Sequence, residues 1–153
     1  MERLETDEVN CGLFQVRTKS AKEVLVARAV EIVNEILKKI NDVCSDSIKV
    51  IQKTYKERQV QLVPEDADKL EEEQLKELKK LVSENETTMQ KLKNEVDTIA
   101  DYFLILEKYM YNIEASTYDN FWLLKEGPQN IKDAVEEANR IITDRENKLS
   151  EKL

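Results

Sequence analysis

One stripe of apolar residues, spaced alternately by three and four positions, constrains this chain more than any other feature. It begins at Leu75 and continues to Ile113 without an error in the spacing. Such a/d periodicity is typical of an α-helix that packs on neighbouring helices in coiled-coil fashion. We therefore predict a long helix over residues 66–112. The stripe consists of Leu75, Leu78, Val82, Asn85, Met89, Leu92, Val96, Ile99, Phe103, Leu106, Met110 and Ile113.

Asn85 is the one polar member of this stripe, and it permits two interpretations. Either a single helix passes through with a buried asparagine, or two helices meet at a break near residue 84. The unbroken register favours a single helix. Ser83 and Glu86 have the spacing of a capping box, which favours a helix start at this point. The sequence alone leaves both interpretations open.

A second apolar stripe lies upstream and predicts another long helix. Ser20 and Glu23 form a capping box that would begin it, and Pro64 would end it, because proline has no amide donor. The stripe is widened before residue 40 by Val24, Leu25, Ala29, Ile32 and Ile36, so we expect that half to lie between other elements. The stripe consists of Val26, Val30, Val33, Leu37, Ile40, Cys44, Ile48, Ile51 and Tyr55.

The remaining sequence predicts two further helices. A short aromatic-rich helix follows Ser116. Gly127 then suggests a left-handed cap, and Pro128 fits the first turn of a last helix. That helix carries Arg145 in its apolar stripe and reaches the end of the sequence without a capping signal, so we expect the natural chain to continue.

The scarcity of Gly and Pro, two of each, argues against a sheet-rich fold, which needs a turn every few residues. The predicted fold is all-α, an elongated antiparallel bundle of four to five helices that reverses near Pro64, Asn112 and Gly127. Residues 1–10 are expected to be disordered. Residues 11–153 are expected to form one domain, with residues 11–16 as an extended segment docked on the bundle.

Composition also limits the function. The chain has no His, which removes the commonest general base and metal ligand, and it shows no phosphate loop or metal-ligand cluster. We therefore expect no catalytic residues, cofactor or metal. A net charge of −8 argues against a nucleic-acid partner, and the sequence lacks a membrane-spanning run. Cys11 and Cys44 are expected to be reduced thiols of an intracellular protein.

Aromatic residues are concentrated between residues 102 and 122. They could fill the core where the long helix meets the last two helices. They could also form a contact patch, since Trp and Tyr are favoured in interfaces. The candidate interface residues are Tyr111, Tyr118, Phe121 and Trp122.

Several segments, taken in order, resemble the tail of dynein heavy chains just before the linker, and the axonemal type more than the cytoplasmic one. Two are GLFQV at residues 12–16 and KEVL at residues 22–25. Further matches follow Pro64, namely LKELK at 75–79, YFLILEKY at 102–109, Trp122 and PQNI at 128–131. The resemblance covers about residues 11–150 and contains no catalytic signature.

This resemblance implies a structural segment that joins the linker to the assembly or cargo end and transmits force in microtubule-based movement. In that family, ATP hydrolysis belongs to the AAA+ ring and microtubule binding to the stalk tip, both outside this segment. The implied partners are neighbouring domains of the same heavy chain and other dynein subunits. The implied location is the cytoplasm and cytoskeleton, or the axoneme of a cilium or flagellum. The alternative is a stand-alone helical-bundle or coiled-coil interaction module.

Overall fold

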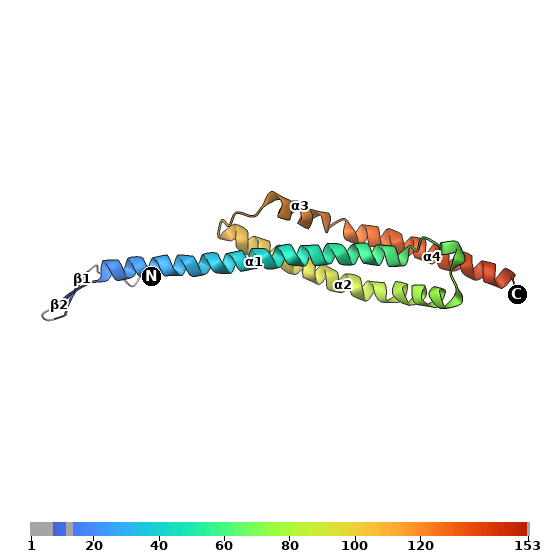
Figure 1. Cartoon of the computed structure of the whole chain (residues 1–153), viewed down its shortest axis with the longest axis horizontal. Helices are drawn as coiled ribbons and strands as arrows, with labels where there is room; N and C mark the ends of the chain where they lie inside the picture. Colours follow the sequence, from blue (N-terminus) through green and yellow to red (C-terminus); the bar gives the residue numbers. More distant parts are fainter. Residues whose placement is uncertain (1–7, 12–13, 153) are drawn as a thin grey trace. The chain divides into compact units, whose positions relative to one another are not determined.

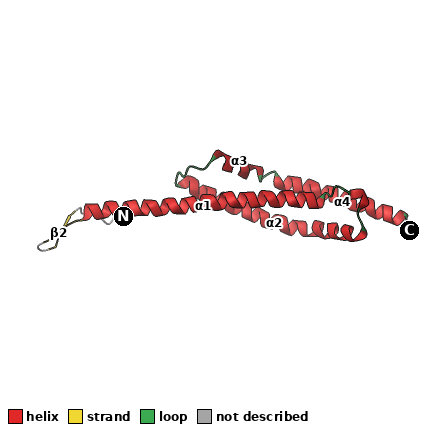
Figure 2. Ribbon diagram, in the orientation of Figure 1, coloured by secondary structure: helices red, strands yellow, loops and turns green. Residues whose placement is uncertain are grey.

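A computed structural model describes residues 8–11 and 14–152 (Figure 1). The chain is helical apart from a short hairpin and the connections, so the predicted all-α class is confirmed at that level (Figure 2). In chain order, the elements are β1 (Glu8–Cys11), β2 (Phe14–Arg17), α1 (Thr18–Leu62), the 3₁₀ turn η1 (Ala67–Lys69), α2 (Glu72–Lys108), α3 (Ala115–Leu123) and α4 (Gly127–Glu151).

The chain divides into two compact units, residues 1–40 and residues 41–153, where the sequence predicted one domain from residue 11. In the first unit, β1 pairs antiparallel with β2. Residues 8–10, expected to be disordered, therefore belong to a strand, while residues 1–7 lie outside the described residues. The extended conformation expected around residue 14 is confirmed by β2. Its docking on the bundle stays a prediction.

α1 begins at Thr18 and ends at Leu62, two residues before Pro64. The predicted end is therefore confirmed, but the predicted start is wrong, because Ser20 and Glu23 both lie inside the helix. In the first unit the side chains of Val24, Leu25 and Val30 are more than half exposed. The expected cover of this half of the helix by other elements stays a prediction.

In residues 41–153 three helices pack against each other. α1 reaches α2 through Arg58, whose guanidinium donates to the Thr88 hydroxyl at 3.0 Å. Lys79 near the start of α2 pairs with Glu146 near the end of α4, so these two helices run antiparallel. The most completely buried side chains are Cys44, Ile48, Ile51, Leu62, Leu106, Leu124 and Ile131.

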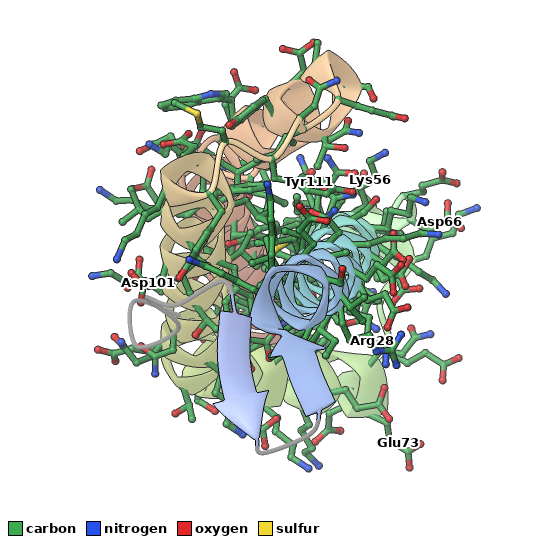
Figure 3. All side chains as sticks on the ribbon, turned by 90° about the vertical axis from the view of Figure 1, so that its left-hand side faces the viewer. Arg28, Lys56, Asp66, Glu73, Asp101 and Tyr111 are labelled. Carbon is green, nitrogen blue, oxygen red and sulfur yellow. The ribbon has the colours of Figure 1, made fainter. Side chains whose placement is uncertain are left out.

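α2 is one continuous helix, which decides between the two interpretations of Asn85. Seven members of the predicted stripe are buried, six in α2 and Ile113 just beyond its end. Charged residues such as Glu73 and Asp101 lie on the outside of the helix (Figure 3). The helix begins at residue 72, later than predicted. There the backbone N–H of Glu71 donates to the Gln74 side-chain carbonyl at 3.0 Å. The buried members are Leu75, Leu78, Leu92, Ile99, Phe103, Leu106 and Ile113.

α2 ends in a Schellman motif that the sequence did not predict. The N–H of Tyr111 donates to the Leu106 carbonyl at 2.9 Å, and the N–H of Met110 donates to the Glu107 carbonyl at 3.0 Å. Met110 takes the left-handed position of this motif, with φ of 55°, and its side chain is 92% exposed. The expectation that Met110 continues the buried stripe is therefore wrong, because the helix has already ended at Lys108.

Replacing Met110 by glycine is expected to stabilise the chain by about 0.5–1 kcal/mol. Glycine adopts positive φ without the steric cost of a Cβ, and little packing is lost from so exposed a side chain. Thermal and urea unfolding of the full chain would measure the gain. Met110→Ala is the matched control, because it shortens the side chain but keeps the Cβ. An equal gain in both variants would contradict the role of backbone conformation.

Gly127 does not form the predicted left-handed cap. It is the first residue of α4, and the N–H groups of Leu124, Lys125, Glu126 and Gly127 each donate to the carbonyl three residues earlier. These hydrogen bonds carry the chain onward in a helical path, so α4 continues in the direction of α3 and the predicted reversal near Gly127 is wrong (Figure 1). Pro128 lies in the first turn of α4, as predicted.

The hydrogen bonds of Arg145 explain why a charged residue occupies the apolar stripe of α4. Its guanidinium donates to the backbone carbonyl of Asp68 at 2.9 Å and to that of Leu70 at 2.6 Å. Lys148, one turn later, pairs with the Asp68 carboxylate at 3.5 Å. The end of α4 therefore holds the connection between α1 and α2.

Candidate interaction surfaces

The predicted aromatic cluster lies where the end of α2 meets α3, and part of it is core. The Phe103 ring is 4.9 Å from the Phe121 ring, edge to face at 84°, and 5.4 Å from the Tyr118 ring. Phe103 and Phe121 are 4% and 8% exposed. Offset and edge-to-face aromatic pairs are stabilising beyond the area they bury. These rings therefore anchor α3 on α2, and Phe121 is not available to a partner.

Tyr118 is tied to α2 by its hydroxyl, which donates to the Glu107 carboxylate at 2.9 Å. Desolvation, followed by the hydrogen bond and the negative charge of Glu107, raises the pKa of Tyr118 above its usual value. Tyr111 is half-buried. Tyr118 therefore acts first as a link between α2 and α3.

Trp122 is the member of the predicted set that faces solvent, with 58% exposure. The Lys125 ammonium lies 3.9 Å from the centre of its ring, a cation–π distance. Leu123 beside it is 53% exposed. Of the four predicted interface residues, the structure leaves Trp122 as the most accessible.

A groove that the sequence did not predict lies between α2 and α4, with Tyr55 of α1 also in its wall. Its volume is about 900 Å³. Burial and the charge of Glu95 raise the pKa of Tyr55 above its usual value, so this phenol is neutral at pH 7. The groove is lined by apolar side chains of α2, of α4 and of the turn before α4, namely Met89, Val96, Leu124, Ile131 and Val135.

Three of the α2 stripe positions line this groove and are only half-buried: Asn85, Met89 and Val96. The polar Asn85 within the stripe was the one sequence signal at this place. The a/d spacing could not show that these three side chains are only partly covered, because their burial depends on how far α4 lies from α2.

Cys44 is a fully buried free thiol in α1. Burial raises its pKa from 9.0 to about 11, because the charged thiolate is disfavoured away from water. The thiol is therefore protonated and unreactive at neutral pH. The reduced state expected for this residue agrees with the structure, whereas the side chain of Cys11 lies outside the description.

Ionisation of Cys44 is expected to lower the free energy of unfolding by about 2 kcal/mol as the pH rises from 9 to 11. The folded state holds the Cys44 proton more tightly than the unfolded state, so the contribution is complete below pH 9 and is lost towards pH 11. Urea unfolding at several pH values would measure it. The Cys44→Ala variant is the control, because it keeps the other groups that titrate at high pH, Tyr55, Tyr118 and Cys11. The difference between the pH profiles of the two proteins therefore isolates Cys44. Identical pH profiles would contradict the prediction.

The part of the chain that the structure describes contains no group of three or more Cys, Asp or Glu side chains arranged to hold a metal ion. Of its helices, none combines the length and apolar character needed to cross a membrane.

We compared the chain with protein-family models, with curated proteins and with solved structures, and none of the three comparisons gives a match.

Proposed function

We propose that the chain is a non-catalytic, force-transmitting segment of a dynein heavy chain tail, most similar to the axonemal type. In this proposal the complete bundle is elongated and antiparallel, with four to five helices, and it joins the linker to the assembly or cargo end. Its partners are neighbouring domains of the same heavy chain and other dynein subunits. It acts in the cytoplasm on the cytoskeleton, or in the axoneme of a cilium or flagellum.

One observation carries this proposal: α2 is unbroken over 37 residues and packs on other helices along its stripe. At 1.5 Å per residue such a helix is roughly 55 Å long. Burying one face along that length resists bending, because bending would open the packed stripe and expose apolar area. The two ends of such a helix move together, which a segment that transmits force requires. The dynein-like segments supply the identity of the motor.

The proposal is tested by sequencing the transcript beyond the codon of Leu153. A frame that continues into a linker and AAA+ modules is the expected result. A stop codon, or a frame that continues into unrelated domains, would overturn it. As an independent measurement, antibodies against residues 41–153 should detect a polypeptide that sediments with microtubules and is released by ATP.

A stand-alone interaction module is the second candidate, and the exposed Trp122 and Leu123 on α3 favour it. Adjacent large apolar side chains in water are typical of contact surfaces. Analytical ultracentrifugation of the full chain separates two forms of this candidate. A monomer fits an intramolecular bundle with a free contact surface, whereas a tight dimer fits a coiled coil.

A further inference from the structure

The groove between α2 and α4 has the position that another helix would take in a larger bundle. Three helices pack against each other in residues 41–153, and helix bundles commonly complete their core with a fourth. Met89 and Val96 occupy core positions of the α2 stripe but are only half-buried, whereas Leu92 between them is 6% exposed. The uncovered part of the stripe therefore faces the groove.

The shape of the groove fits a helix. Its α2 wall runs from residue 85 to residue 97, roughly 18 Å at the rise of an α-helix. Its opposite wall presents Ile131 and Val135 of α4, four residues apart, and Leu124 of the turn that leads into α4. Apolar side chains at helical spacing on both walls match the i, i+3, i+4 and i+7 anchors of an amphipathic helix bound in a groove.

The charges at the rim give the occupant its chemistry. The side of the groove opposite α2 contributes two lysines, Lys125 of the turn before α4 and Lys132 of α4, and no carboxylate. The α2 side is mixed, with Lys93 between Glu86 and Asp97. Over the described residues, no carboxylate oxygen lies within 4.0 Å of the ammonium of Lys93 or Lys132. An all-basic edge on a chain of net charge −8 favours an acidic edge on the partner.

Asn85 adds a polar position at one end of the groove. Its side-chain carbonyl oxygen is inaccessible to solvent and accepts no hydrogen bond from the described residues. A buried acceptor without a donor is unfavourable. The Asn85 side chain would have to rotate before a donor from the occupant could reach this oxygen.

We infer that this groove binds one amphipathic α-helix of another protein, with its apolar face on Met89, Val96 and Ile131 and an acidic edge along α4. The inference goes beyond the proposed function and does not depend on it, because it rests on the groove alone. A partner with a basic edge would meet Lys125 and Lys132 and be rejected. A second copy of this chain is a separate outcome of the test.

The test uses three fluorescent helical peptides of about three heptads and the full chain. The first has leucine at its a and d positions and glutamate on the edges. The second has lysine on the same edges, and the third has the composition of the first with its leucines dispersed. Fluorescence anisotropy measures the dissociation constants. The acidic amphipathic peptide is expected to bind at least tenfold more tightly than either of the others.

Charge-reversal variants locate the binding. Lys132→Glu alone should weaken binding of the acidic peptide about threefold, and the double variant Lys125→Glu/Lys132→Glu about tenfold. The effects are modest because each exposed ion pair contributes little. The single variant keeps the contact of Lys125 with Trp122. Lys49→Glu and Lys91→Glu are matched controls, because these exposed lysines do not line the groove. Circular dichroism confirms that each variant remains folded.

A third variant tests the apolar wall. Val96→Asn is expected to weaken binding of the acidic peptide more than tenfold, because it places an amide among apolar contacts. Equal affinity for the acidic and basic peptides would overturn the inference, as would an unchanged affinity in Val96→Asn. Sedimentation of the unliganded chain as a dimer that dissociates in Val96→Asn would also overturn it, because the occupant would then be a second copy.

Discussion

Gly127→Ala is expected to destabilise the full chain by about 2 kcal/mol, although alanine is ordinarily the better helix residue. A Cβ at this position would lie 2.6 Å from the Cδ2 and Cε2 atoms of the Tyr55 ring and 2.9 Å from its Cζ. The ring is buried, with 7% exposure, so it cannot move aside into solvent. Either the ring or the start of α4 must shift, and both changes disrupt the contact between α1 and α4.

A double-mutant cycle with Tyr55→Leu isolates this contact. The smaller leucine should leave room for the new methyl group, so Gly127→Ala should be close to neutral in that background. Urea unfolding of the four proteins gives the coupling free energy. The same loss in both backgrounds would show that the close approach to Tyr55 is not the reason for glycine at this position.

Phe103→Ala is expected to lower the free energy of unfolding by about 3–5 kcal/mol, the largest of the expected losses. The phenyl ring is 4% exposed and contacts both Tyr118 and Phe121. Its removal leaves a cavity where α3 is anchored on α2. Denaturant unfolding measures the loss, and α3 should become more susceptible to proteolysis.

Leu104→Ala is the matched control for this prediction. It is the next residue on α2 and is 64% exposed, so its truncation should change stability by less than about 0.5 kcal/mol. Leu106→Ala removes a side chain with no exposed surface and should cost about 3 kcal/mol. Similar small losses at Phe103 and Leu104 would contradict the placement of Phe103 in the core.

The helices could be predicted because their signals are local. The a/d spacing of α2 identified all six side chains that this helix buries, and Pro64 marked the end of α1 through its missing amide donor. Met110 was assigned wrongly by the same reasoning. The spacing continued through it, but the backbone had already turned into the left-handed conformation.

The aromatic cluster was located by the sequence, but the role of each member was not. Phe121 and Trp122 are adjacent in α3, yet one contacts Phe103 and the other is exposed. Consecutive helical residues point about 100° apart, so the orientation of α3 on α2 decides which of them is core. That orientation follows from contacts between segments distant in the chain.

The sequence by itself determined the helical class, the long α2 and the absence of His, because these depend on residue type and on spacing along one helix. The tertiary structure decided why Gly127 must be small, which aromatic residues face solvent and where α2 remains uncovered. Those properties depend on the distance and rotation between helices, which are set by the packing of side chains from several segments at once.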